Sequence, residues 1–197
     1  MNDDGVIKFQ CQWTEEPHGV EVPQDLMHWR DRMHALGLIG VYKSDGIGYG
    51  NISIKVADGM LISGTQTGHL ASLTPDQYSL VTEYDIATNS LHCLGRVKAS
   101  AESLTHLAFY EADPSIQGVI HIHDLEMWQD LMNKVPTSSA AVPYGTPEMA
   151  REITRLFKES HLPMKKIMVM AGHSEGLIAF GSDLEEAAAV ILPLIER

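Results

Sequence analysis

The sequence predicts an α/β fold in which a predominantly antiparallel sheet is covered on its faces by helices. Strand-like segments joined by short turns and helical segments that flank them support this prediction. The chain has 197 residues, of which 44% are hydrophobic and 20% are charged. These values are typical of one globular domain, which we expect to extend over residues 1–197.

Two hairpins are the basis of the sheet prediction. The alternating segment 52–56 is followed by Asp58-Gly59, a strong turn signal, and by the apolar segment 60–62. A second pair of strands is predicted around Thr88-Asn89, over residues 78–86 and 90–94. Three more strands are predicted over residues 118–122, 167–171 and 177–180. The glycine-rich segment 46–50 is predicted to lack regular structure and to allow a close backbone approach.

One helix is predicted near the start of the chain, and a second is predicted near its middle. The first begins near Pro23, a favoured first-turn residue, and ends at Gly37. Its apolar residues have helical spacing and are expected in the core: Leu26, Trp29, Met33 and Leu36. The second is predicted over residues 100–112, where Asp113-Pro114 ends it.

Two further helices are predicted in the last third of the chain. Thr146-Pro147-Glu148 combines an N-cap, a first-turn proline and an acidic first turn. The buried stripe of this helix is expected to be Met149, Ile153, Leu156 and Phe157. Ser182 and Glu185 have the spacing of a capping box for a final helix, which Pro193 is expected to end or kink.

The charge balance excludes some classes of partner. With 14 basic and 26 acidic residues, the net charge is −12, which argues against binding to nucleic acid or to an anionic membrane. A small phosphorylated substrate needs only a few local donors. No secretory signal and no apolar segment of about 20 residues is visible, so we expect a cytoplasmic protein. Cys11 and Cys93 have neither metal nor redox spacing, so no disulfide framework is expected.

His121 and His123 form the most specific local feature. In a strand, residues two apart share a face, so both imidazoles point the same way while Ile120 and Ile122 point into the other layer. Two charged imidazoles would repel each other, whereas a divalent metal binds neutral imidazole. The pair is therefore either part of a metal site or two solvent-facing histidines on an edge strand.

His173 and Glu102 are candidates to complete such a site. His173 lies in the glycine-flanked segment 172–176, and three histidines with one open position are typical of a catalytic metal site. Glu102 is predicted in the first turn of a helix that Ser100 would cap, with His106 one turn later. Next to a metal, Glu102 would be a ligand or a general base. The alternatives are a loop histidine without a partner and a glutamate that only stabilises a helix start.

Residues 172–176 also match G-x-S-x-G, the nucleophile elbow of α/β-hydrolases, with Ser174 as the nucleophile. That motif requires a helix after the serine and, later in the chain, an acid and a histidine. Here a predicted strand follows, and the sequence contains no histidine after His173. We therefore reject the hydrolase interpretation.

An ordered set of motifs resembles those of the class II aldolase/adducin family over roughly residues 24–190. The spacing of Glu102 and His121 also resembles that of the fuculose-phosphate aldolase branch. The matching motifs are Gly50-Asn51-Ile52-Ser53, Leu61-Ile62-Ser63-Gly64-Thr65-Gln66-Thr67-Gly68, Lys98-Ala99-Ser100-Ala101-Glu102 with His106, Ala112-Asp113-Pro114, Gly118-Val119-Ile120-His121-Ile122-His123 and Gly172-His173.

The resemblance implies an α/β/α sandwich and a cyclic homotetramer with sites between neighbouring subunits. It implies Zn²⁺, or Mn²⁺, Fe²⁺ or Co²⁺, held by His121, His123 and His173, with Glu102 as the catalytic acid/base and as a ligand of the metal before substrate binds. The implied reaction cleaves or forms a C–C bond in a sugar phosphate or a related small hydroxycarbonyl compound. It proceeds through a metal-stabilised enediolate.

The resemblance also implies a phosphate site that uses backbone N–H groups of a glycine-rich turn and a helix N-terminus. The residues that correspond to this site are Asn51, Thr67, Gly68 and Ser100.

Departures from the family pattern leave other functions open. Ala101 stands where the aldolases usually have a second serine, and Gly48 stands where a phosphate-binding threonine is common. Tyr144 is the available counterpart of the tyrosine that reaches into a neighbouring subunit's site. The alternatives are an epimerase or dehydratase of a pentulose phosphate on the same metal site, and a non-catalytic assembly module like the adducin head domain.

Overall fold

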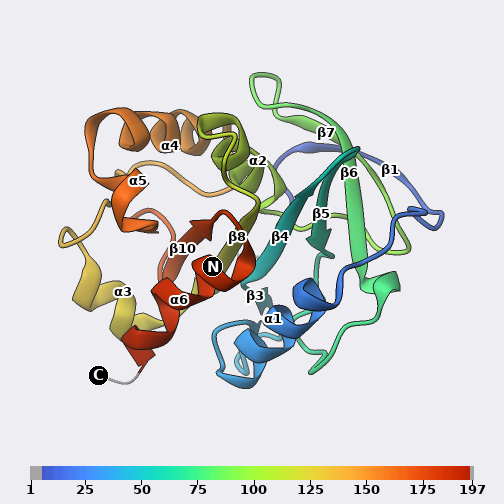
Figure 1. Ribbon diagram of the computed structural model, residues 1–197, viewed down its shortest axis with the longest axis horizontal. Coiled ribbons are helices and arrows are strands. Elements are labelled where there is room, and N and C mark those ends of the chain that lie inside the picture. The colour runs from blue at the N-terminus through green and yellow to red at the C-terminus, as the bar shows by residue number, and fades with distance from the viewer. Residues whose placement is uncertain (1–5, 196–197) are drawn as a thin grey trace.

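An eight-stranded sheet with helices on both faces forms the centre of the computed structural model (Figure 1). The structure describes residues 6–195, so the N-terminal residues on which the signal prediction depends lie outside it. The strand order is β1-β7-β6-β5-β4-β8-β10-β9. Neighbouring strands are antiparallel except β1 and β7, which are parallel. The predicted α/β/α sandwich on a predominantly antiparallel sheet is confirmed.

The elements follow one another in the order of their labels. The strands are β1 (Gln10–Thr14), β2 (Gly40–Val41), β3 (Gly48–Tyr49), β4 (Asn51–Val56), β5 (Gly59–Ser63), β6 (Tyr78–Asp85), β7 (Ser90–Leu94), β8 (Gly118–His123), β9 (Ile167–Val169) and β10 (Gly176–Gly181). The helices are α1 (Gln24–Ala35), α2 (Ser103–Ala112), α3 (Leu125–Leu131), α4 (Pro147–Glu159), α5 (Leu162–Lys165) and α6 (Leu184–Ile195), with a 3₁₀ turn at Pro75–Gln77. Within residues 6–195, no helix is both long and apolar enough to cross a membrane.

The alternation of side chains along the strands divides the core into two layers. In β8, Val119 packs into the layer that α2 and α4 cover, whereas Ile120 and Ile122 pack into the layer that α1 and α6 cover. In Figure 1, α2 and α4 lie on one side of the sheet, and α1 and α6 lie on the other. Because His121 and His123 have the same parity as Val119, their side chains lie on the α2 side.

Both predicted hairpins form. In the first, Val56 pairs with Gly59, whose φ of +139° and proximity to Val81 exclude any side chain. A Cβ at this position would lie 1.9 Å from the Val81 carbonyl oxygen. In the second, the turn contains Asn89 in the left-handed region, at φ +52°.

Several predicted boundaries differ from the structure. Helix α2 begins at Ser103 instead of residue 100, because residues 100–102 form a turn. The glycine-rich segment is partly regular, since β3 pairs with β2. Strand β9 ends at Val169. Leu36 follows the end of α1 and is 39% exposed, so its placement in the core was wrong. Pro193 lies within α6 and does not end it.

Strand β1 and helices α3 and α5 were not predicted. The β1 segment is rich in glutamine and lies at the sheet edge, so its alternation is weak. It pairs in parallel with β7, which places the Sγ atoms of Cys11 and Cys93 3.8 Å apart, although both are free thiols. The two cysteines are 82 positions apart in the sequence, so no local pattern predicted this contact.

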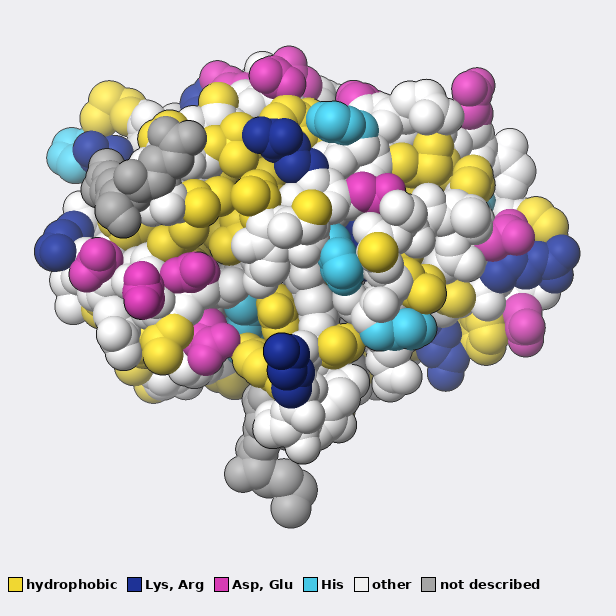
Figure 2. Space-filling view, turned by 90° about the horizontal axis from the view of Figure 1, so that it is seen from below, with side chains coloured by type: hydrophobic (Ala, Val, Ile, Leu, Met, Phe, Trp, Pro, Cys, Tyr) yellow, Lys and Arg dark blue, Asp and Glu magenta, His cyan; other side chains and the backbone are white. Residues whose placement is uncertain are grey.

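The face of the molecule shown in Figure 2 carries charged, polar and hydrophobic side chains. On the face shown in Figure 2, Lys and Arg lie among Asp, Glu and hydrophobic residues and do not gather into one basic patch. A continuous basic surface is the usual footprint of a nucleic-acid-binding protein. The face in Figure 2 does not have that footprint.

The N-terminus of α6 is capped one residue later than predicted. Asp183 Oδ1 accepts a hydrogen bond of 2.7 Å from the Glu186 N–H, and Glu186 Oε2 accepts one of 2.7 Å from the Ser182 N–H. The predicted Ser182–Glu185 box was therefore wrong. Glu185 and Glu186 are adjacent, so the sequence is compatible with a cap at Ser182 and with a cap at Asp183.

We predict that Asp183→Ala lowers the free energy of unfolding by about 1 kcal/mol, because the α6 N-terminus loses its cap. Urea unfolding measures this change. Glu185→Ala, which removes an exposed side chain from the same turn, is the matched control and should have a smaller effect. Equal losses in the two variants would contradict the observed register.

Candidate metal centre

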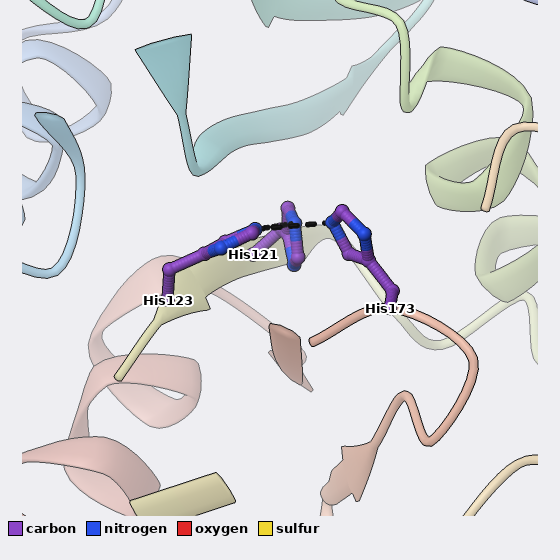
Figure 3. Close-up of side chains that lie close together, drawn as sticks. All are labelled: His121, His123 and His173. Carbon is purple, nitrogen blue, oxygen red and sulfur yellow. Dashed lines mark hydrogen bonds between the residues drawn. The ribbon is translucent and has the colours of Figure 1, made fainter. Parts of the chain in front are cut away.

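Three histidines converge on one point at the end of β8 (Figure 3). His121 and His123 come from β8, and His173 comes from the loop between β9 and β10. His123 Nε2 lies 3.1 Å from the Nε2 atoms of both His121 and His173. The three side chains are at most 5% exposed. Because β8 lies between β4 and β10, the edge-strand alternative for this pair was wrong.

Glycines shape the loop that carries His173. The loop closes through hydrogen bonds of 3.0 Å from the Met170 N–H to the Gly176 carbonyl and from the Gly176 N–H to the His173 carbonyl. A Cβ at Gly176 would lie 2.6 Å from His173 Cδ2, and one at Gly172 would lie 2.2 Å from the Val142 carbonyl oxygen. The glycine-flanked motif therefore makes room for the His173 ring and for the neighbouring backbone.

Hydrogen bonds outside the cluster fix the orientation of two rings. His121 Nδ1 lies 3.0 Å from the Leu177 carbonyl oxygen, which only accepts, so Nδ1 carries the proton. His123 Nδ1 lies 2.8 Å from the Tyr42 hydroxyl, which donates to Glu175 Oε2 at 3.0 Å. Tyr42 has only one proton to donate, so His123 Nδ1 is also a donor. The Nε2 lone pairs of both rings therefore face the centre of the cluster.

The three imidazoles are neutral at ordinary pH. Burial, together with the neighbouring His173, lowers the pKa of His121 to about 3. Burial, with Lys8 nearby, lowers the pKa of His173 to about 3. Burial and the two other rings hold the pKa of His123 well below its usual value. Neutral rings are the form in which histidine binds a metal.

The donor set fits a divalent ion. Two nitrogen atoms that each bind Zn²⁺ at 2.0–2.1 Å with tetrahedral geometry are about 3.3 Å apart. The observed Nε2–Nε2 distances of 3.1 Å are close to this separation. Without a cation between them, converging lone pairs at this distance would repel. His121, His123 and His173 are therefore the residues that could hold the metal.

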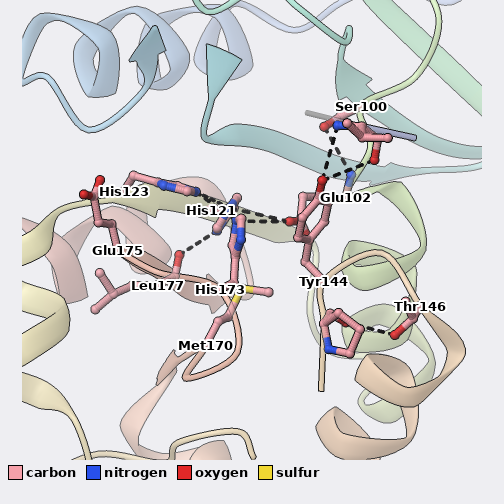
Figure 4. Close-up of polar contacts among 12 residues, drawn as sticks. Ser100, Glu102, His121, His123, Tyr144, Thr146, Met170, His173, Glu175 and Leu177 are labelled. Atoms are coloured by element: carbon pink, nitrogen blue, oxygen red, sulfur yellow. Dashed lines mark hydrogen bonds and ion pairs between the residues drawn. The ribbon is translucent and has the colours of Figure 1, made fainter. Parts of the chain in front are cut away.

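Glu102 points toward the histidines from the start of α2 (Figure 4). Its Oε1 lies 3.5 Å from His173 Nε2 and 3.8 Å from His121 Nε2, and its side chain is buried. Glu102 is the N-cap residue of α2 and not part of the first turn, and its side chain does not cap the helix. Its carboxylate is therefore directed to the histidine cluster, where it could ligate a metal or transfer protons.

Two other predicted residues lie beside the cluster. His106 does not join it, because its Nδ1 is 2.7 Å from Ser53 Oγ in the interior of the α2 layer. The Tyr144 ring lies 4.5 Å from the His173 ring, between centroids, and its hydroxyl accepts a hydrogen bond from the Val6 N–H. Tyr144 is buried in its own chain, so it is not available to reach a neighbouring subunit's site.

The residues implied for phosphate binding share one cleft with the histidines and Glu102. Within residues 6–195, Asn51 Oδ1 is buried without a hydrogen-bond partner. The Thr67 hydroxyl donates to the Gly64 carbonyl at 2.8 Å. A Cβ at Gly68 would lie 2.1 Å from the Gly40 carbonyl oxygen, so only glycine fits there. Ser100 Oγ is 3.4 Å from the Glu102 N–H. The structure therefore brings all four residues to the metal candidates.

Tyr42 and Glu175 are functional candidates that the sequence patterns did not predict. Glu175 belongs to the segment that also matched the hydrolase motif, and its positive φ of +67° is unusual for a residue other than glycine. Tyr42 lies far from His123 in the sequence and has no local motif. Only the folded chain shows that the two residues support a histidine.

We predict that the metal-free protein loses stability as the pH falls from about 6.5 toward 3. Histidines of the unfolded chain take up protons near the ordinary pKa of 6.5, whereas buried His121 and His173 remain neutral to about pH 3. Protons therefore favour the unfolded state in this range, by about 1.4 kcal/mol per pH unit for each histidine. Urea unfolding of chelator-treated protein at several pH values measures the slope.

A variant with one buried histidine fewer provides the comparison. His121→Ala should lose stability less steeply than the wild type over the same pH range. The exposed His28→Ala is the control and should keep the wild-type slope. A wild-type slope in His121→Ala would show that His121 is not held neutral by burial.

Comparison with known proteins identifies the family of the chain. The family model of the class II aldolase and adducin N-terminal domain matches residues 32–196. The 3-oxo-tetronate 4-phosphate decarboxylase of Haemophilus influenzae is 26% identical over 161 residues, which cover 72% of this chain and 70% of that protein. The methylthioribulose-1-phosphate dehydratase of Pectobacterium atrosepticum is 24% identical over 165 residues, which cover 70% of this chain and 75% of that protein.

The fold is also shared with solved structures. The crystal structure of L-fuculose-1-phosphate aldolase from Thermus thermophilus superposes with a TM-score of 0.59 and 22% identity, covering 87% of each chain. The family match extends over most of the sequence. The chain therefore belongs to the class II aldolase and adducin N-terminal domain family.

Proposed function

We propose that the protein is a divalent-metal-dependent lyase that cleaves or forms a C–C bond in a sugar phosphate or a related small hydroxycarbonyl compound. The observation that carries the proposal is the convergence of three neutral, buried Nε2 atoms with the Glu102 carboxylate. An assembly module has no physical need for such a set, because burying a carboxylate and three unprotonated imidazoles costs stability.

His121, His123 and His173 would hold the ion. When bound, a divalent ion supplies a Lewis acid that stabilises negative charge developing on substrate oxygens. The contacts of His121 with the Leu177 carbonyl and of His123 with Tyr42 keep two of the rings oriented. Contacts of this kind keep metal ligands in place and raise their basicity.

Glu102 is the proposed acid/base. In the cleavage direction, a base removes the proton of the substrate hydroxyl, the C–C bond breaks as that oxygen becomes a carbonyl, and the electron pair remains on the other carbon. A proton must then be returned to that carbon. The buried Glu102 Oε1, 3.5 Å from His173 Nε2, lies where it could carry both protons.

The same site is suited to related reactions. Aldol cleavage and decarboxylation both leave an electron pair on a carbon next to a carbonyl group, and the Haemophilus influenzae relative is named a decarboxylase. The Pectobacterium atrosepticum relative is named a dehydratase, so dehydration or epimerisation of a pentulose phosphate remains the second candidate.

The distal part of the cleft is proposed to bind the substrate phosphate through Asn51, Thr67, Gly68 and Ser100. Backbone N–H groups at a glycine turn are effective donors to phosphate. The family resemblance also leads us to propose a homotetramer.

The proposal is tested by incubating the metal-loaded protein with a panel of ketose, aldose and 3-oxo-acid phosphates. We expect release of an aldehyde or of CO₂ from at least one compound. Glu102→Gln should lower that rate at least about 100-fold, because the acid/base is lost. Product analysis and metal content are measured on the same samples, and the metal content should stay near the wild-type value.

Glu111→Gln removes an exposed carboxylate from the other end of α2 and is the matched control, with an expected rate near the wild type. If the panel yields dehydrated or epimerised products and no product of C–C cleavage, the second candidate function replaces the first. Substantial activity in Glu102→Gln would remove Glu102 from the acid/base role.

A further inference from the structure

Arg30 is a buried cation attached to the turn that lines the cleft. It lies on α1 among core residues, its side chain is 1% exposed, and it does not itself line the cleft. Its Nη2 donates to the Thr67 carbonyl at 2.9 Å, and its Nη1 donates to the Leu70 carbonyl. The half-buried Asp31 lies 3.4 Å away and is its ion-pair partner. The guanidinium therefore connects α1 to both ends of the segment 67–70.

The Thr67 carbonyl belongs to the same peptide unit as the Gly68 N–H. The described chain has no cis peptide bond, so this carbonyl and this N–H point in opposite directions. The Thr67 carbonyl accepts a second hydrogen bond, of 3.1 Å, from the Leu70 N–H. Hydrogen bonds in a chain polarise one another, so two donors on the carbonyl, one of them charged, make the Gly68 N–H a stronger donor.

The Gly68 N–H is available to a ligand. Thr67 and Gly68 line the cleft that contains the histidines and Glu102. Within residues 6–195, the Gly68 N–H makes no hydrogen bond to the protein. The turn is also pressed against Gly40, where a Cβ on Gly68 would lie 2.1 Å from the carbonyl oxygen. The N–H is therefore held in a fixed place.

An anion in the cleft would be attracted by a metal ion at the histidines and by any cationic side chain that lined the cleft. Among the described residues that line it, none is Lys or Arg, and Glu102 is acidic. The net charge of the chain is −12. Arg30 supplies a positive charge directly hydrogen-bonded to the turn, although it is hidden from the ligand.

We propose that Arg30 is a positioning residue of the anion site, which holds and polarises the Thr67–Gly68 peptide so that the Gly68 N–H binds a phosphate group. This inference rests on the proposed function, in which Thr67 and Gly68 bind the substrate phosphate. It explains how a phosphate can be recognised in a cleft that, among residues 6–195, no Lys or Arg side chain lines.

The test uses inorganic phosphate as the probe and the zinc-loaded, ¹⁵N-labelled full chain. In the wild type, titration should shift the Gly68 amide resonance saturably. In Arg30→Met, which keeps most of the buried volume without the charge, we expect phosphate to bind at least about tenfold more weakly. Before phosphate is added, the Gly68 amide proton of this variant should also lie upfield of its wild-type position.

Two comparisons separate this role from a purely structural one. Arg32→Met removes an exposed arginine from the same helix and should bind phosphate like the wild type. The amides of Gly48 and Gly50, which line the same cleft, should keep their positions in Arg30→Met, whereas a general disturbance of the cleft would move all three. Unchanged phosphate affinity in Arg30→Met would overturn the proposal for Arg30 alone.

Failure of the phosphate site itself gives a different result. If the Gly68 resonance of the wild type does not respond to phosphate, both this inference and the proposed phosphate site are wrong. If Arg30→Met does not fold, Arg30→Lys is the decisive variant. It keeps the charge but cannot bind both carbonyls with a planar fork, so we expect several-fold weaker phosphate binding. Wild-type affinity in Arg30→Lys would overturn the role of Arg30.

Discussion

The burial of three unprotonated imidazoles around one point is the constraint on which the site depends. His121, His123 and His173 have Nε2 atoms within reach of one another and almost no exposure to water. Two of the rings are held from behind, by the Leu177 carbonyl and by Tyr42, so that their lone pairs converge. Such an arrangement is costly for the protein alone and favourable around a divalent cation.

The sheet topology makes this convergence possible. Antiparallel pairing of β8 with β10 places His123 opposite Gly176, directly after the loop that returns His173 to the cluster. Pairing of β8 with β4 places His121 opposite Asn51, which joins the cleft from the other side. The start of α2 adds Glu102, and α1 supports the turn at Thr67 through Arg30. Each layer of the sandwich therefore contributes one component of the site.

Features with a local pattern could be predicted from the sequence. Alternation and turn residues predicted both hairpins, and the spacing of His121 and His123 predicted that their side chains share a face. The boundaries of α2 and the cap of α6 were displaced, because neighbouring polar residues allow more than one register. His173 and Glu102 were predicted to join His121 and His123, as candidate ligands and from the family resemblance. The structure brings these four side chains together.

Other features depend on contacts between distant segments and have no local signature. Tyr42 supports His123 across 81 positions, and Arg30 binds the Thr67 carbonyl across 37 positions. The alternation of side chains in β1 is weak. This segment forms a strand because it pairs with the edge of β7. These parts of the site could be found only in the folded chain.

Metal stoichiometry shows whether the three histidines bind a divalent ion. Elemental analysis of tag-free protein should find about one zinc, manganese, iron or cobalt ion per chain. The double variant His121→Ala, His123→Ala should lose this ion while circular dichroism still shows a folded protein. The exposed pair His28→Ala, His161→Ala should retain it. If the wild type binds no metal after reconstitution, or if the His121/His123 variant binds as much metal as the wild type, these histidines do not form a metal site.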